Sequence, residues 1–172
     1  KARFRFTHEA GQGYRHYIEG TSWGVPLLKV NERYLDGVGR MELPFGTVED
    51  DPQVNQGANL GLWAESMWYP AIYLTDPRVR WEPVGDTTAH LVVPFEDGEE
   101  TFTVHFNADT GLIDHMVTLR YKGADSDAKT EWRLEPRGGW RTVHGMLVPV
   151  SGAAIWGDED GPWAVFTMED VV

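Results

Sequence analysis

The chain has 172 residues, of which 41% are hydrophobic and 24% are charged, as in an ordinary soluble globular domain. Its net charge of -12 comes from 27 acidic and 15 basic residues, and phosphate backbones repel such a surface, so nucleic acid is excluded as an expected partner. The absence of cysteine excludes disulfides, thiolate catalysis and cysteine-based zinc sites.

The length favours a single domain over residues 1–172. No run of about 20 apolar residues is present, so membrane attachment would need a segment that this chain does not contain. We expect a protein that is soluble as given, in the cytoplasm or the cell envelope. The composition does not indicate the oligomeric state.

Alternating apolar and polar residues predict strands in the first part of the chain. Gly, Pro and Asp separate these strands, as is typical of turns. Gly37 and Gly39 indicate a bend or a β-bulge. The predicted strands occupy residues 2–9, 13–20, 27–35 and 37–43.

The stretch NLGLWAESMWYP, residues 59–70, breaks this pattern. Its apolar residues recur at i, i+3, i+4, i+7 and i+8, which predicts a helix over residues 58–69 that ends before Pro70. Glu65 lies at the edge of the apolar stripe, where an unpaired carboxylate would be costly. It therefore either forms a structural ion pair or acts on a ligand. The expected partners are Arg120 first, then Arg133, Tyr121 or Trp132.

Strand-like alternation resumes after the helix. The residues between 99 and 121 predict an antiparallel hairpin, because NADTG at 107–111 supplies turn chemistry between two β-rich arms. Gly138 and Gly139 predict another turn. The later strands are expected at residues 79–84, 88–95, 100–106, 112–121, 129–136, 140–156 and 163–172.

About ten strands and one main helix predict an α+β domain that is mostly β. We expect one large curved antiparallel sheet, a half-barrel, with the helix on its concave face. One helix is too small to cover such a sheet, so the remaining apolar face would close into a barrel, fold over as a sandwich or enclose a cavity.

No metal site is expected, because the six histidines show no ligand spacing. His105 and His115 lie on opposite arms of the predicted hairpin, and whether they meet depends on the strand register. No nucleophile motif and no phosphate-binding glycine loop is present, so we expect no cofactor.

Aromatic residues carry the remaining signal, since they suit both cores and clefts for amphipathic ligands. The residues predicted to line a ligand site are Trp63, Glu65, Met67, Trp68, Trp81, Arg120, Trp132 and Trp156. The candidates for acid–base catalysis are Glu65, His115 and Tyr121.

The ordered stretches NERYLDGVGRME, WAESMWYPAIYL, FNADTGLIDHMVTLRY and HGMLVPVSGAAIW resemble the uncharacterised DUF6544 (DUF6920-like) family of bacteria and archaea. The most specific element is A-E-x-x-W-x-P from Ala64 to Pro70, supported by Arg120–Tyr121 and by G-x-x-x-P from Gly145 to Pro149. The resemblance runs from about residue 30 to the end. It implies no reaction, and its strand-rich layout is similar to lipoprotein-carrier (LolA-like) half-barrels with an apolar cavity.

Three functions are compatible with these observations. The favoured one is binding or carrying an apolar or amphipathic, lipid-like small molecule between the sheet and the helix. The second is a cofactor-free enzyme with Glu65 as general acid or base. The third is an envelope protein-interaction module with a filled core.

Overall fold

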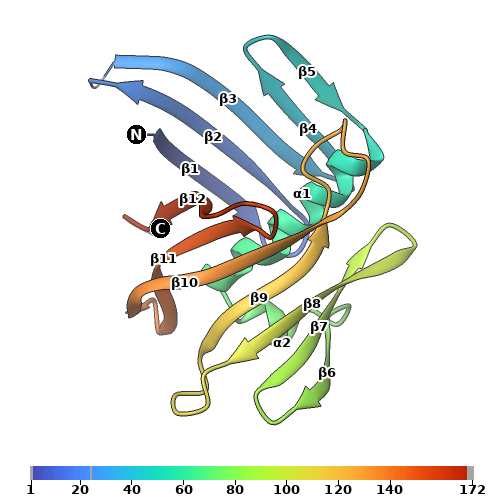
Figure 1. The fold of residues 1–172 in the computed structure, drawn as a ribbon, viewed down its shortest axis with the longest axis vertical. Helices are drawn as coiled ribbons and strands as arrows, with labels where there is room; N and C mark the ends of the chain where they lie inside the picture. Colours follow the sequence, from blue (N-terminus) through green and yellow to red (C-terminus); the bar gives the residue numbers. More distant parts are fainter. Residues whose placement is uncertain (1, 24, 170–172) are drawn as a thin grey trace. The chain divides into compact units, whose positions relative to one another are not determined.

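In the computed structural model, which describes residues 2–23 and 25–169, the strands form two antiparallel sheets (Figure 1). The first sheet has the order β1-β2-β3-β4-β5 and the second β12-β11-β10-β9-β8-β7-β6. The mostly-β, antiparallel class with one main helix is thus confirmed. The strands are, however, divided between two sheets instead of forming one, and the described residues form no closed barrel.

The first sheet contains β1 (Ala2–Glu9), β2 (Gly13–Ser22), β3 (Val25–Leu35), β4 (Val38–Leu43) and β5 (Gly46–Glu49). The second contains β6 (Arg80–Gly85), β7 (Thr88–Phe95), β8 (Gly98–Phe106), β9 (Ile113–Arg120), β10 (Thr130–Val143), β11 (Met146–Trp156) and β12 (Pro162–Thr167). The helices are α1 (Pro52–Glu65), the 3-10 turn η1 (Ser66–Trp68) and the short α2 (Ile72–Thr75).

The chain is divided into two compact units. The first comprises residues 1–62 and 121–127, and the second residues 63–120 and 128–172. The boundary between the units falls inside α1, between Leu62 and Trp63. The prediction of a single domain stays a prediction.

Helix α1 begins at Pro52 instead of residue 58. The Oδ1 atom of Asp51 accepts hydrogen bonds from the backbone N–H groups of Gln53 and Val54, at 2.9 and 3.1 Å. Asp before Pro is a strong helix start, because Asp caps the free N–H groups and Pro suits the first helical position. Sequence analysis overlooked this start because the charges of VEDDP are typical of a loop.

One face of the first sheet packs against α1. The backbone N–H of Gly39 on β4 donates to Asn55 Oδ1 at 2.7 Å, and the Tyr34 hydroxyl on β3 donates to Asn59 Oδ1 at 3.2 Å. A side chain on Gly39 would meet Val54, so glycine permits the close approach of strand and helix. A buried cluster of Tyr14, Tyr34, Ala58 and Leu62 fills this contact.

The predicted hairpin between residues 99 and 121 is confirmed as β8 and β9. Its turn is built by Asn107, whose Oδ1 accepts hydrogen bonds from the backbone N–H groups of Asp109 and Thr110. Gly111 completes it with a φ of 69°. The register places His105 directly opposite His115.

The turn predicted at Gly138 and Gly139 is wrong. Both glycines lie within β10, where the pairing with β11 shifts between Arg137 and Trp140 as in a β-bulge. The chain reverses instead at His144 and Gly145, which both have positive φ, at 48° and 82°. The predicted strand 140–156 is therefore the end of one strand and the whole of the next.

The last predicted strand, residues 163–172, is observed as β12 as far as Thr167. Its residues 170–172 lie outside the described residues.

Candidate functional site

The side of the first sheet that faces α1 is organised in rows, because directly paired residues of antiparallel strands share a face. Next to the helix lie His8, Tyr14, Tyr34 and Gly39, one from each of four neighbouring strands. The next row contains Phe6, His16, Glu32, Met41 and Val48. A third row contains Phe4, Ile18 and Val30. The face thus changes from polar and aromatic near α1 to apolar away from it.

At the centre of the polar part, the Glu32 carboxylate contacts two aromatic rings that stack on each other. The Tyr14 hydroxyl donates to Glu32 Oε1 at 2.5 Å, and Glu32 Oε2 lies 3.5 Å from His16 Nδ1. The ring of His16 stacks on Tyr14 with centroids 3.9 Å apart and is only 6% exposed. These contacts fix the orientation of the His16 imidazole, whose other nitrogen, Nε2, is shielded from solvent.

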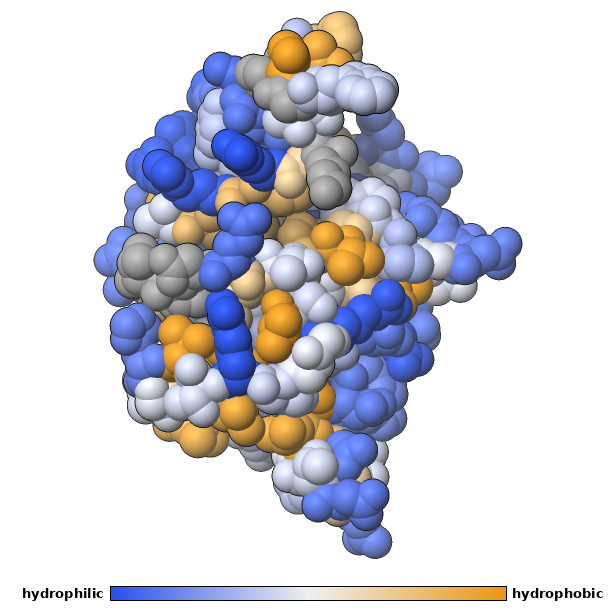
Figure 2. All heavy atoms as spheres, turned by 90° about the vertical axis from the view of Figure 1, so that its left-hand side faces the viewer, coloured by the Kyte–Doolittle hydropathy of each residue, from blue (hydrophilic) through white to orange (hydrophobic). Residues whose placement is uncertain are grey.

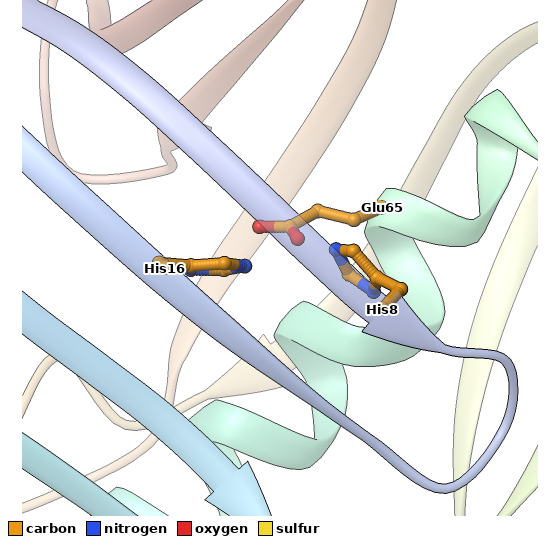
Figure 3. A group of neighbouring side chains, drawn as sticks. All are labelled: His8, His16 and Glu65. Carbon is orange, nitrogen blue, oxygen red and sulfur yellow. The ribbon is translucent and has the colours of Figure 1, made fainter. Parts of the chain in front are cut away.

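His8, from the neighbouring strand β1, lies beside this imidazole (Figure 3). The rings of His8 and His16 have centroids 5.6 Å apart. Glu65 is the last residue of α1, four positions after Gly61, which faces the Tyr14 hydroxyl.

The apolar end of the same face is partly open. Phe4, Leu28 and Leu43 are 42–43% exposed, and Ile18 and Val30 between them are half-buried. The turns that follow β2 and β4 lie at this end and carry the fully exposed rings of Trp23 and Phe45. Figure 2 shows hydrophobic side chains at the upper end of the molecule, where these turns lie.

The opposite face of the first sheet is charged. Arg5, Arg15, Arg33 and Arg40 line a hollow of about 260 Å³. Arg40 donates to Glu49 Oε2 at 2.8 Å, and this hydrogen bond lowers the pKa of the Glu49 carboxyl. Desolvation raises the pKa of this carboxyl, but its effect is smaller than that of the hydrogen bond from Arg40. This hollow contains none of the residues predicted to bind a ligand.

Four of the predicted ligand-lining residues lie near the end of α1 or on β6. Trp63 and Met67 are buried. The indole Nε1 of Trp68 donates to the backbone oxygen of Pro149 at 3.1 Å, and that of Trp81 donates to the backbone oxygen of Tyr73 at 3.1 Å. Trp68 and Trp81 therefore each have a structural hydrogen bond within the second unit.

Arg120, Trp132 and Trp156 do meet. The guanidinium carbon of Arg120 lies 4.4 Å from the ring centre of Trp132 and 5.5 Å from that of Trp156, as in a cation–π contact. Both indoles are buried. The expected pairing of Arg120 with Glu65 stays a prediction.

Of the catalytic candidates, His115 stacks on His105 with ring centroids 4.3 Å apart, and its Nδ1 lies 2.8 Å from Asp114 Oδ2. The pKa of His105 is lowered, most strongly by desolvation of its imidazole and next by the nearby His115. The backbone N–H of Tyr121 donates to Gln56 Oε1 at 3.2 Å, which connects the 121–127 segment to α1. These contacts place His115 in the second unit and Tyr121 in the first.

Sequence analysis did not single out His8 and His16. The signal was present: residues 2–9 and 13–20 were both predicted strands joined by a short turn. Positions 8 and 16 are both even, and pairing of His8 with Tyr14 puts them on one face. What was missing was the register, since a shift of one residue would separate them.

Comparison with protein families matches residues 1–168 to a family of unknown function, DUF6544. The chain belongs to the DUF6544 family. The resemblance seen in the sequence alone begins at about residue 30. The family match also covers β1 and β2 of this DUF6544 protein, which carry His8 and His16. No curated protein and no solved structure matches the chain. Among the described residues of the DUF6544 chain, no helix is long and apolar enough to cross a membrane.

Proposed function

We propose that this protein binds an apolar or amphipathic small molecule on the open part of the α1-facing side of its first sheet. The observation that carries this proposal is the partial exposure of Phe4, Leu28 and Leu43 around Ile18 and Val30 on one continuous face. Apolar side chains gathered on a surface and bordered by polar groups are typical of a binding site.

The arrangement of the rows suits a ligand with two chemically different ends. An acyl chain or another apolar group would pack on Phe4, Ile18 and Val30. A polar headgroup would lie toward His16 and Glu32, one row nearer to α1. Burying the apolar group would contribute about 25 cal/mol for each Å² removed from water.

A dansyl-labelled fatty acid tests the proposal by fluorescence titration. We expect a saturable increase and blue shift of dansyl emission with the full chain. The double variant Leu28→Glu/Leu43→Glu places two charges on the apolar surface at partly exposed positions, so it should weaken binding at least tenfold while the protein stays folded.

The matched control is Leu119→Glu/Val165→Glu, which adds the same charges at exposed apolar positions of β9 and β12. It should bind the probe like the natural protein. A titration without saturation in the natural protein would contradict the proposal, and so would an equal loss of binding in both double variants.

A further inference from the structure

We propose that the arginine-lined hollow of the first sheet binds the phosphoryl group of a small soluble molecule. The hollow measures about 260 Å³, and four arginines line it: Arg5, Arg15, Arg33 and Arg40. They lie on β1, β2, β3 and β4, all within the first compact unit. This inference does not depend on the apolar binding surface, which occupies the other face of the same sheet.

The strand register brings these arginines together. Arg15 on β2 lies directly opposite Arg33 on β3, and Arg33 lies directly opposite Arg40 on β4. Arg5 is opposite Tyr17, which is two residues along β2 from Arg15 and therefore on the same face. Like charges directly opposite each other destabilise a sheet. This row of arginines is thus unfavourable unless negative charge lies close to it.

The protein supplies such negative charge to only one side of the row. Glu49 on β5 lies 2.8 Å from Arg40 and 3.3 Å from Arg33. Within residues 2–23 and 25–169, by contrast, neither Arg5 nor Arg15 forms an ion pair. Both of these arginines are exposed, so an anion from solution can reach them.

Two glutamates also line the hollow. Glu42 is already paired with Arg40 at 2.9 Å, and the Glu32 carboxylate accepts the hydrogen bond from Tyr14 on the other face of the sheet. Neither glutamate neutralises the arginines of β1 and β2. The side of the hollow formed by these two strands therefore keeps an excess of positive charge.

A phosphoryl group suits this arrangement. Guanidinium groups bind phosphate through two parallel N–H donors, and they keep their charge at any physiological pH. Thr7 lies directly opposite Arg15 and also lines the hollow, so its hydroxyl can donate to a further oxygen. A tetrahedral dianion accepts hydrogen bonds from several directions, whereas a carboxylate offers only two oxygens in one plane.

The rest of the chain restricts the ligand to a small molecule. The net charge of -12 repels long polyanions and anionic membrane surfaces, but a small anion can enter a locally positive hollow. A volume of about 260 Å³ also lies just below that of pockets for drug-sized ligands, about 300–1,000 Å³. Because the site is open to solvent, its affinity should fall as the salt concentration rises.

Titration of the isotope-labelled full chain with sodium phosphate, followed by NMR at low ionic strength, tests the proposal. Sodium chloride and sodium acetate at matched ionic strength are the control salts. We expect saturable shifts of the backbone amide signals of Arg5, Thr7 and Arg15 with phosphate alone. Arg5→Gln/Arg15→Gln should weaken phosphate binding by about tenfold or more, because hydrogen bonds between charged groups are lost.

The matched control is Arg80→Gln/Arg137→Gln, which removes the same charge from partly exposed positions of β6 and β10. This variant should bind phosphate like the natural protein. The amide spectra show that both variants are folded, which we expect because Arg5 and Arg15 are exposed. The proposal is overturned if phosphate gives no saturable shifts, if acetate binds as tightly, or if both double variants lose binding equally.

Sedimentation with phosphatidylcholine vesicles that contain phosphatidic acid tests a lipid as the source of the phosphoryl group. We expect no binding of the natural protein to these vesicles. Binding to the vesicles without binding of free phosphate would overturn the assignment of a small soluble ligand.

Discussion

His16 and Glu32 are direct neighbours across β2 and β3, and Nδ1 of the imidazole lies 3.5 Å from Oε2 of the carboxylate. The other oxygen of Glu32 accepts the short hydrogen bond from Tyr14. The Glu32 side chain is only 19% exposed, and a carboxylate with so little access to water is costly unless such groups stabilise it. The arrangement therefore stabilises the fold and at the same time orients His16.

Removing the Tyr14 hydroxyl should measurably destabilise the protein. Hydrogen bonds to charged groups contribute about 1.5–3 kcal/mol, so Tyr14→Phe should lower the free energy of unfolding by that amount in urea denaturation. The control is Tyr17→Phe on the other face of β2, whose hydroxyl makes an exposed contact with Glu19 at 3.4 Å. Its effect should stay within about 0.5 kcal/mol. If both variants lowered the free energy of unfolding equally, the Tyr14–Glu32 hydrogen bond would contribute no more to stability than the exposed Tyr17–Glu19 contact.

Gly39→Ala tests the close packing of α1 on the first sheet. The new methyl group would lie 3.2 Å from Val54 Cγ1, 3.2 Å from Val54 O and 3.3 Å from Ala58 Cβ. Because backbone atoms are among the neighbours, the helix would have to shift, and we expect a loss of about 1–3 kcal/mol. Gly46→Ala on β5 is the control, since its added methyl group meets nothing within 4 Å. Thermal unfolding of both variants measures the difference, and an unchanged Gly39→Ala protein would contradict this packing.

The start of α1 is a further test of the fold. Asp51→Ala removes the side chain that accepts hydrogen bonds from the N–H groups of Gln53 and Val54. Loss of such a cap costs about 0.5–2 kcal/mol, measurable as a lower midpoint of urea unfolding. Asp160→Ala, in the exposed turn between β11 and β12, should change the midpoint little. A midpoint lowered equally by Asp160→Ala would instead indicate a general effect of removing negative charge.

Stability should fall in mildly acidic solution because of His105. Its pKa in the folded protein is lowered from 6.5 by desolvation and by His115, so below pH 6.5 the unfolded chain takes up the proton first. The stability is thus complete above pH 6.5 and decreases as the pH falls toward the lower pKa of the folded state.

NMR titration of the imidazole protons checks this shift directly. In His115→Gln one of the three causes that lower the pKa of His105 is removed, the others being desolvation and the charge of Arg133. The pKa of His105 should therefore move back toward its ordinary value, and the acid-side loss of stability should become smaller. A His105 pKa above 6.5 in the folded natural protein would contradict the expected direction.

Several features of the fold follow from local sequence patterns. The β8–β9 hairpin could be predicted because Asn107 and Gly111 build the turn from their own neighbourhood. The apolar periodicity before Pro70 predicted a helix as far as residue 69, but α1 ends at Glu65 and only the 3-10 turn η1 continues to Trp68. Capping chemistry at Asp51 and Pro52 would have given the start of α1. Such signals depend on residues a few positions apart, which a sequence displays directly.

Two positions where the chain could turn, Gly138–Gly139 and His144–Gly145, mark the limit of local patterns. Both have positive φ. Only the pairing of β10 with β11 decided that the first is a β-bulge and that the chain reverses at the second. The conformational preference of glycine permits either outcome. The choice depends on which register buries the apolar side chains of both strands.

By itself, the sequence determined that this is a mostly antiparallel β protein of the DUF6544 family with one apolar helix and a carboxylate near that helix's end. The sequence also excluded disulfides, thiolate catalysis and cysteine-based zinc sites, because the chain contains no cysteine. Only the tertiary structure decided that the strands divide into two sheets and that His8, His16 and Glu32 come together on one face of the first sheet. The reason is physical: these three side chains meet through the registers of β1, β2 and β3, and strand register is fixed by packing and not by local sequence.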